Sequence, residues 1–412
     1  MKKILASAEA FGFGPASKLH AVSAELRRRG MQVHVVAAGA SLAFAQSNAD
    51  SFDAVIPVDE PEELAKVAPE DYDGALSVMD PYLVLWARVN GLPSVYVDSL
   101  YWFWQWHPDR EGPLQHQASQ LAATINVLDA LRSLSLVPMH DSQYLAHHLS
   151  DASCVQDASK VGARAAALRG LGRVEVVNAV IDLTHRNPGP PRRWLATTSG
   201  LVNPLLPAES AVEWIRIVGR LLEEAADLAG LTDRITMAGH PDLLARAADV
   251  ASARIELVPL SHREILEALN QAVACLTPPG LTTMLECAAY GVPFIMLPEQ
   301  HYGHVSNFRE VTACGSAGTF PHALIDPDGR GRAGDVLDQT LQVVDQLRRH
   351  FENRSEVWSR LVQDMADGMR KARDVREPLR AAQAAAVHEF VGGYTGARQV
   401  ADVVASILGK GA

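Results

Sequence analysis

The sequence contains few cysteines, and it has no long apolar run. Its four cysteines form no CxxC pair, so neither a disulfide framework nor a zinc motif is indicated, and we expect small buried residues. The N-terminus carries Lys2 and Lys3 but turns polar at Glu9. This pattern excludes the apolar core of a signal peptide and a membrane span of ~20 residues. A cytoplasmic protein without a membrane span is therefore expected.

Basic residues are also in deficit. The chain has 37 Lys and Arg against 48 Asp and Glu, for a formal net charge of −11. Nucleic-acid binding normally requires clustered Lys and Arg, so no nucleic-acid partner is expected. The 412 residues, 48% of them hydrophobic, exceed the roughly 250–300 at which a single core stops growing. Two domains are expected, each with its own core.

Short β-branched runs alternate with amphipathic segments along both halves of the chain, which predicts an α/β fold of two Rossmann-like, doubly wound domains. The predicted strands are 4–8, 33–37, 54–58, 75–78, 94–98, 134–138, 174–177, 195–198, 234–238, 255–258, 273–276 and 293–297. A segment with three prolines at 185–193 marks a linker. The predicted divisions are an N-terminal domain at 1–185, a second domain at 194–375, and C-terminal helices at 376–412 that pack back on the first domain. Ligands should lie at the carboxyl ends of the strands, in a cleft between the domains.

The most informative motif begins after the predicted strand 273–276. Pro278, Pro279 and Gly280 break the chain, and Thr282 and Thr283 open a helix whose backbone N–H groups can bind a diphosphate. Glu286 lies three and four residues further on the same helix face, where its carboxylate can accept hydrogen bonds from a ribose diol. The alternative interpretation is a capped helix with a solvated Glu.

The whole stretch 255–318 resembles the donor-binding region of GT-B glycosyltransferases, including the macrolide, plant secondary-metabolite and peptidoglycan GlcNAc-transferase types. The matching segments are 257–260, 278–286, Gly291-Val292-Pro293, Pro298-Glu299-Gln300 and Asn307-Phe308. The resemblance implies that Gly280, Thr282 and Thr283 hold the diphosphate of a nucleotide sugar and that Glu286 holds its ribose. It further implies that Gln300, His301 or His304 meets the donor sugar, and that no metal or other cofactor is bound. The family's His is Pro278 here, and its Trp and Gln are Leu257 and Leu260.

A second phosphate loop is predicted at the end of strand 195–198, where Thr198, Ser199 and Gly200 combine hydroxyls with a glycine. We expect it to contact the β-phosphate of the donor. Ser-Gly turns are common, so an ordinary turn is the alternative.

The segment Phe11, Gly12, Phe13, Gly14 follows the first predicted strand and is expected to line the acceptor site. It lacks the third glycine of a dinucleotide fingerprint, which argues against NAD. In GT-B relatives this loop carries a catalytic His, and Pro15 occupies that place here. The candidate general bases are therefore Glu9, Asp98 and His107, each of which follows a predicted strand.

Five aromatic residues fall within 101–106, in a chain with 6% aromatics. Trp102, Trp104 and Trp106 alternate there and are predicted to stack a flat acceptor. The alternative is a loop packed on its own domain.

The stretch 7–19 resembles the N-terminus of cytosylglucuronic acid synthases, which implies a heterocyclic base as acceptor and UDP-glucuronate as donor. The expected function is transfer from a nucleotide sugar, most simply a UDP-sugar, to a small acceptor in bacterial natural-product biosynthesis. A sugar-nucleotide epimerase of the same architecture and a non-catalytic nucleotide-sugar-binding protein are the alternatives.

Overall fold

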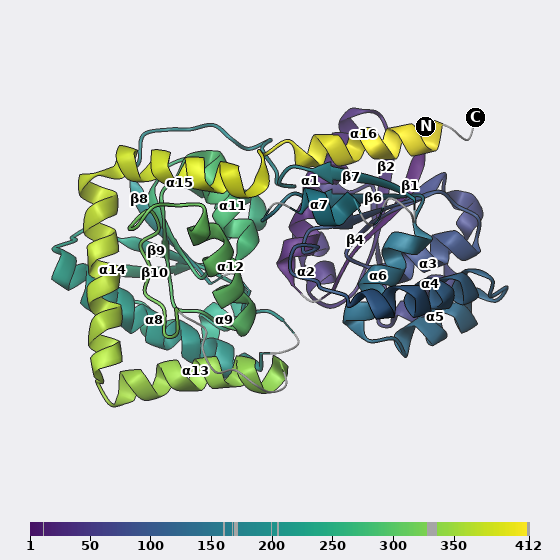
Figure 1. Cartoon of the computed structure of the whole chain (residues 1–412). Helices are drawn as coiled ribbons and strands as arrows, with labels where there is room; N and C mark the ends of the chain where they lie inside the picture. Colours follow the sequence, from purple (N-terminus) through teal and green to yellow (C-terminus); the bar gives the residue numbers. More distant parts are fainter. Residues whose placement is uncertain are drawn as a thin grey trace. The chain divides into compact units, whose positions relative to one another are not determined.

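The computed structural model describes residues 1–10, 12–159, 161–166, 168, 172–198, 200–203, 206–327 and 336–409. Two parallel sheets contain the described strands, one in each of two units of the chain (Figure 1). The first unit comprises Met1–Asp182 and Val391–Ala412, and the second comprises Leu183–Phe390. The last helix of the chain therefore belongs to the same unit as the N-terminus.

The first sheet has seven strands in the order β3-β2-β1-β4-β5-β6-β7. Their bounds are β1 Lys3–Ala8, β2 Gln32–Ala37, β3 Ala54–Pro57, β4 Gly74–Val78, β5 Ser94–Asp98, β6 Ala152–Gln156 and β7 Arg173–Val177. Ile4 and Ala6 of β1 enter one hydrophobic core, whereas Leu5 enters the core on the opposite face. Strands buried on both faces are typical of parallel sheets. The strand order reverses between β1 and β4, and open α/β sheets bind ligands at such a switch point.

Helices cover both faces of this sheet (Figure 1). They are α1 Phe13–Arg28, α2 Gly39–Ser47, α3 Pro81–Val89, α4 Pro108–Ala122, α5 Val127–Ser135, α6 Met139–Leu149, α7 Gly162–Ala165 and α16 Gly396–Gly409, with 3-10 turns η1 Ala49–Ser51, η2 Pro61–Lys66 and η3 Pro69–Asp71. Leu19 of α1 and Val400 of α16 share one core, and Trp86 of α3 and Leu131 of α5 share the other. The sheet is thus the middle layer of this unit.

The strand predicted at 134–138 is wrong. Residues 127–135 form α5, whose Leu131 and Leu134 are buried, and the strand between β5 and β7 is β6 instead. The apolar residues of 134–138 fit a short strand as well as the end of an amphipathic helix, because a short run does not separate the two periodicities. The mixed polarity of β6 concealed a strand that is buried throughout.

The second sheet has five parallel strands in the order β10-β9-β8-β11-β12. Their bounds are β8 Arg193–Thr197, β9 Ile235–Ala238, β10 Ile255–Val258, β11 Ala272–Thr277 and β12 Phe294–Met296. The surrounding helices are α8 Ala208–Ala229, α9 Pro241–Arg246, α10 His262–Leu269, α11 Leu281–Tyr290, α12 Tyr302–Ala313, α13 Val336–Glu352, α14 Glu356–Asp374 and α15 Arg376–Val391, with the 3-10 turn η5 Ala248–Val250. The order of the strands reverses between β8 and β11.

The second unit extends beyond residue 375, because most of α15 packs on it. The side chain of Gln383 accepts a hydrogen bond from the Phe294 N–H at 2.9 Å and donates one to the Phe294 carbonyl at 2.8 Å. These bonds cover the edge strand β12, whose backbone groups would otherwise lack a neighbour. We expected the whole segment 376–412 to pack on the first domain. Residues 391–412, with α16, belong to the first unit, whereas 376–390 belong to the second.

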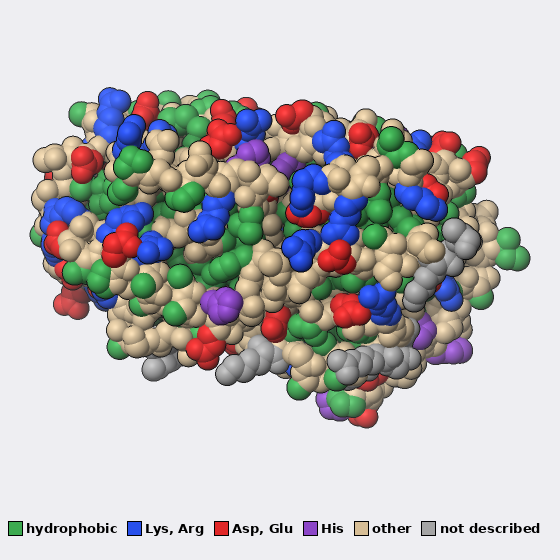
Figure 2. Space-filling view, turned by 90° about the horizontal axis from the view of Figure 1, so that it is seen from above, with side chains coloured by type: hydrophobic (Ala, Val, Ile, Leu, Met, Phe, Trp, Pro, Cys, Tyr) green, Lys and Arg blue, Asp and Glu red, His purple; other side chains and the backbone are tan. Residues whose placement is uncertain are grey.

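On the face drawn in Figure 2, Lys and Arg side chains are interspersed with Asp and Glu. Such mixing leaves no broad region of one sign on that face. None of the described helices combines the length and the apolar character that a membrane crossing requires.

Candidate functional site

The switch point of the second sheet brings two loops together. Thr197 ends β8 and Thr277 ends β11, and the Thr197 hydroxyl donates to Oγ1 of Thr277 at 3.0 Å. Thr277 in turn donates to the carbonyl of Pro278 at 3.0 Å. The loops that follow the two strands therefore leave the sheet from linked points, where a ligand is expected in an open α/β sheet.

The start of α11 provides the geometry of an anion site. Gly280 is the N-cap, and Thr282 and Thr283 lie in the first turn. Asn307 of α12 donates from Nδ2 to the carbonyl of Pro279 at 2.9 Å, which holds the loop in front of the helix. The first-turn N–H groups of a helix point away from it, and the helix dipole favours negative charge at that end. Both effects suit a diphosphate.

Glu286 of α11 is buried, with 3% of its surface exposed. Its Oε1 accepts a hydrogen bond from Nε2 of His262 at 2.8 Å. A carboxylate offers about four acceptor positions, so Glu286 can still receive hydroxyl groups from a ligand. His262 therefore fixes the orientation of this carboxylate.

We did not predict His262 from the sequence, although a local signal for it exists. Ser261 and Glu264 form a capping box at the start of α10. This motif defines the first helical residue, which is His262. What the motif does not give is the distance from α10 to α11, because that depends on how the two helices pack.

The loop after β12 contributes an unusual amide. Gln300 is fully buried, yet its Oε1 and Nε2 have no hydrogen-bond partner within the described part of the chain. Nearly all buried polar side-chain atoms in proteins are hydrogen-bonded. An amide left open in this way indicates a place for a polar ligand.

Two histidines lie beside this amide. The ring centroids of His301 and His304 are 3.8 Å apart, and Nδ1 of His304 accepts the Gln300 backbone N–H at 3.2 Å. Burial lowers the pKa of His301 to about 4. Burial, and secondarily the neighbouring His301, lowers the pKa of His304 well below its usual value. Both rings are therefore neutral at pH 7, and Nε2 of His304 can carry a hydrogen for donation.

The loop after β8 reaches the same side chains. A Cβ placed on Gly200 would lie 2.9 Å from Oε1 of Gln300 and 3.8 Å from Nε2 of His304. Thr198 is buried, and a Cβ on Gly239 would lie 2.3 Å from its Oγ1, so a glycine is required at 239. Ser199 lies outside the described residues. Gly200, Gln300 and His304 therefore lie close together. The sequence alone does not indicate these contacts, because the residues belong to separate loops.

In the first unit, Glu9 follows β1 at that sheet's switch point. The backbone N–H of Glu9 donates to the Val78 carbonyl at 3.0 Å. Glu9 is half-buried and lines a pocket of about 380 Å³. Asp80, which directly follows β4 and Met79, lines the same pocket. Glu9 is therefore accessible to a ligand, and Asp80 is a candidate that the sequence analysis missed.

Neither Asp98 nor His107 lies on the wall of the pocket that Glu9 lines. Asp98 is fully buried and pairs with Nε2 of His147 at 3.0 Å, while Nδ1 of His147 lies 3.0 Å from Oγ of Ser153. The side chains of Asp98 and His147 are both fully buried, so this Asp, His and Ser network belongs to the core. His107 is exposed and caps α4, accepting from the Asp109 N–H at 3.4 Å.

The aromatic segment is mostly packed into its own unit. Trp102 and Trp104 are each 8% exposed, and Trp106 stacks on His140 with ring centroids 5.1 Å apart. Arg164, some 60 residues further along the chain, donates to the carbonyls of Tyr101, Trp102 and Trp104. We therefore correct the expectation of an open stacking surface for Trp102 and Trp104, whereas a role of the partly buried Trp106 stays a prediction.

A burial role for Trp104 has a measurable consequence. Trp104→Ala removes a large buried ring from the core around β1 and should lower the free energy of unfolding by about 3–5 kcal/mol. The adjacent Phe103 is 40% exposed, so Phe103→Ala is the matched control and should cost far less. Urea unfolding of both variants checks this. Equal effects of the two substitutions would contradict the assignment.

The segment predicted to line the acceptor site is the beginning of α1. Gly12 is the N-cap, and Phe13 and Gly14 belong to the first turn. Phe13 packs edge-to-face on Phe44, with centroids 5.8 Å apart. Phe11 lies outside the described residues. A role of Gly12, Phe13 and Gly14 toward an acceptor stays a prediction.

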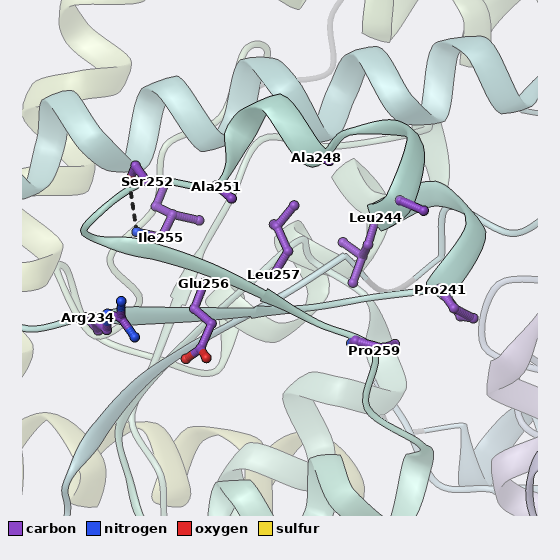
Figure 3. A pocket seen from close by; sticks show the side chains of 11 residues that line it. Arg234, Pro241, Leu244, Ala248, Ala251, Ser252, Ile255, Glu256, Leu257 and Pro259 are labelled. Atoms are coloured by element: carbon purple, nitrogen blue, oxygen red, sulfur yellow. Dashed lines mark hydrogen bonds between the residues drawn. The ribbon is translucent and has the colours of Figure 1, made fainter.

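A larger pocket of about 520 Å³ lies at the edge strand β10, beside α9 and η5 (Figure 3). Its walls include Leu244, Leu257 and Pro259. Figure 3 shows Glu256 and Leu257 pointing to opposite sides of β10, as strand periodicity requires. Leu257 and Pro259 belong to the matched segment 257–260, and none of the predicted catalytic, donor-binding or acceptor-binding residues lines this pocket.

Solved structures resemble the fold of this chain over 99–100% of their own length. The chain is similar to the spinosyn forosaminyltransferase SpnP, with 15% identity, coverage of 99% of both chains and a TM-score of 0.57. It is also similar to Os79 from O. sativa in complex with UDP, with 12% identity, coverage of 98% of this chain and 100% of that chain, and a TM-score of 0.52. UGT89C1 from Arabidopsis thaliana, complexed with UDP, gives 12% identity, coverage of 99% and 100%, and a TM-score of 0.51.

The chain has the GT-B fold. The prediction of two Rossmann-like domains of this type is confirmed. Identities of 12–15% establish a shared fold and leave the activity to be argued from the site. No protein-family model matches the sequence, and no curated protein matches it either.

Proposed function

We propose that the protein is a glycosyltransferase that moves a sugar from a nucleoside-diphosphate sugar to a small acceptor. UDP is the nucleotide that we expect in the donor. One observation carries the proposal: in a GT-B fold, the loops after β8, β11 and β12 of the second unit bring an anion-binding helix start, an oriented carboxylate and an open buried amide to one edge of the sheet. Each of these groups matches a different part of a nucleotide sugar.

The roles follow from the chemistry of each group. Gly280, Thr282 and Thr283 receive the diphosphate at the start of α11. Glu286, oriented by His262, accepts the ribose hydroxyls. The loop of Thr198, Ser199 and Gly200 contacts the β-phosphate of the donor. Gln300, His301 or His304 meets the donor sugar.

The reaction exchanges one bond at the anomeric carbon for another. The bond from this carbon to the diphosphate oxygen breaks with its electron pair on the diphosphate, and the acceptor's nucleophilic atom forms the new bond. The acceptor's proton passes to a base, for which Glu9 is our first choice. The dipole of α11 stabilises the leaving diphosphate, so the step as proposed calls for no bound metal.

UDP is the preferred nucleotide because two similar structures, Os79 and UGT89C1, are complexed with it. Transfer from UDP-glucuronate to a heterocyclic base in the cytoplasm, as part of natural-product biosynthesis, is the narrowest form of the proposal. It rests on the resemblance of residues 7–19 alone.

Calorimetric titration of the full chain with UDP, dTDP, GDP and ADP tests the proposal. We expect saturable binding of at least one nucleoside diphosphate, and UDP first. Failure of all four to bind would sink the proposal. Incubation of the bound UDP-sugar without acceptor separates the alternatives, since new sugar epimers would indicate an epimerase. Binding without turnover under a broad acceptor panel would indicate a non-catalytic protein.

Gly200→Ala should disturb the sugar end of this site. Gly200 has φ +89°, and its new Cβ would crowd Oε1 of Gln300 at 2.9 Å. We expect the free energy of unfolding to fall by about 1–2 kcal/mol because of the positive φ. We also expect the affinity for UDP-glucose or UDP-glucuronate to fall more than the affinity for UDP. Gly230→Ala is the matched control, because Gly230 has φ +65° but no atom within 4 Å of the added Cβ. Calorimetry should find the sugar-specific loss in the first variant alone.

A further inference from the structure

The loop in front of α11 offers few hydrogen-bond donors of its own. Pro278 and Pro279 have no backbone N–H group, and the N–H of Gly280 donates to the Pro278 carbonyl. Beyond this loop, α11 offers the N–H groups of its first turn and the hydroxyls of Thr282 and Thr283. A diphosphate carries two charged groups that both need hydrogen bonds when they leave water. A donor from another element would therefore strengthen this site.

One face of α12 lies beside both loops of the site. Asn307 donates from Nδ2 to the carbonyl of Pro279, in the loop after β11. His304 lies three residues before Asn307, and side chains at this spacing share a helix face. Its Nε2 lies 3.8 Å from the position of a Cβ on Gly200, in the loop after β8. The same face of α12 thus reaches the loops after β11 and β8.

A hydrogen bond determines which ring nitrogen of His304 carries the hydrogen. The backbone N–H of Gln300 donates to Nδ1 of His304 at 3.2 Å. A backbone N–H can only donate, so Nδ1 presents a lone pair and the hydrogen of the neutral ring lies on Nε2. Burial lowers the pKa of His304 well below its usual value and keeps the ring neutral at pH 7. Nε2 is therefore a hydrogen-bond donor.

This donor is open to a ligand. His304 is 2% exposed, and within the part of the chain that the structure describes its Nε2 donates to no other residue. The amide of Gln300, also open, lies beside the same glycine, since a Cβ on Gly200 would be 2.9 Å from its Oε1. Buried polar groups nearly always have partners. Two open groups at one place indicate that a polar ligand binds beside Gly200.

We propose that His304 is a further catalytic residue, whose Nε2–H donates a hydrogen bond to an oxygen of the donor's β-phosphate. The inference rests on the glycosyltransferase function proposed above. The β-phosphate is the partner because Gly200 belongs to the loop assigned to that group, and the hydrogen bond between Thr197 and Thr277 joins this loop to the strand that leads into α11. The amide of Gln300 then remains for the sugar.

The hydrogen bond acts on the charge that develops in the reaction. When the bond from the anomeric carbon to the diphosphate oxygen breaks, its electron pair stays on the β-phosphate, and a donor already in place stabilises it. No proton is transferred. The hydrogen stays on Nε2, because Nδ1 faces the N–H of Gln300 and cannot take up a replacement proton. His304 therefore acts as a neutral hydrogen-bond donor and not as a general acid.

Two substitutions separate the two ring nitrogens. In His304→Asn the amide oxygen can take the place of Nδ1 and accept the Gln300 N–H, but the donor at Nε2 is lost. In His304→Gln the longer side chain can bring an amide N–H to the place of Nε2. His388→Asn, at an exposed position of α15, is the matched control.

The test is calorimetric titration of the full chain with UDP and with UMP, which has no β-phosphate. We expect the wild type to prefer UDP. His304→Asn should weaken UDP about 10- to 100-fold and leave UMP unchanged, His304→Gln should keep most of the preference for UDP, and His388→Asn should keep all of it. An unchanged preference in His304→Asn, equal weakening of UDP and UMP, or equal losses in His304→Asn and His304→Gln would overturn the inference.

UDP-glucose tests the catalytic part of the inference. The terminal phosphate of UDP carries the charge that the leaving diphosphate acquires, whereas in UDP-glucose this phosphate is esterified. His304→Asn should therefore weaken UDP more than UDP-glucose. Equal or greater weakening of UDP-glucose would show that His304 serves ground-state binding alone and would overturn its catalytic role.

The same titrations separate this inference from the proposed function. A wild type that prefers UDP to UMP, with the preference kept in His304→Asn, would remove His304 from the site and leave the transferase function standing. A wild type that binds no nucleoside diphosphate would overturn the proposed function, and the role of His304 with it.

Discussion

Glu286→Gln is expected to weaken UDP binding by about 10- to 150-fold, the loss that corresponds to hydrogen bonds made by a charged group. The carboxylate is 3% exposed and is oriented by the His262 bond of 2.8 Å, so little rearrangement is needed before it accepts the ribose hydroxyls. An amide of the same shape offers one acceptor oxygen and replaces the other by a donor. Calorimetry with UDP measures the effect.

The ligand provides the sharpest control for this assignment. If Glu286 binds the ribose diol, the wild type should prefer UDP over 2′,3′-dideoxy-UDP, and Glu286→Gln should abolish most of that preference. His262→Gln should reduce the same preference, because the carboxylate would lose the group that orients it. Glu352→Gln, on the exposed surface of α13, should change neither affinity. A preference that survives in Glu286→Gln would remove this residue from the ribose site.

The parts of this architecture encoded by local pattern were predictable. Pro278, Pro279 and Gly280 interrupt the chain between β11 and α11, and Gly291, with φ +73°, ends that helix in the left-handed conformation that glycine adopts most readily. These signals depend on neighbouring residues, so a single sequence contains them. The position of the helix start at Gly280 could therefore be predicted from the chain's own residues.

The contacts that orient the candidate groups could not be predicted in the same way. Gly200 and Gln300 are 100 residues apart, and nothing near either residue indicates that a Cβ on one would touch the amide of the other. The aromatic segment illustrates the converse error. Its composition indicated a ligand surface, but Trp102 and Trp104 are buried, and Arg164, from a different part of the chain, donates hydrogen bonds to their carbonyls. Long-range packing determines both outcomes.

Asp80 shows why a residue with a clear local role is easily overlooked. Its sequence context, Asp80-Pro81 before an apolar run, predicts a helix cap, and it is one. Its second property, a place on the wall of a pocket shared with Glu9, arises because β1 and β4 are neighbours in the sheet. Strand order is a property of the whole fold.

Glu9→Gln is expected to reduce turnover by about 10²- to 10⁴-fold, the range typical for loss of a general base, with UDP binding unchanged. Glu9 follows the interior strand β1 and lines the pocket beside Asp80, while Asp98 is fully buried and His107 caps a helix. Of the three predicted bases, Glu9 is therefore the one that lines this pocket. Turnover measured at saturating donor and acceptor separates this loss from weaker acceptor binding.

Two further variants decide whether Glu9 itself removes the proton. Asp80→Asn should raise the acceptor KM more than it lowers kcat if Asp80 only binds the acceptor. A large fall of kcat in Asp80→Asn with near-normal kcat in Glu9→Gln would transfer the role of base to Asp80. Glu70→Gln, at an exposed carboxylate of the same unit, is the matched control and should leave both parameters unchanged. If kcat fell in neither pocket variant, the acceptor would have to lose its proton without a carboxylate base, as a sufficiently acidic N–H group can.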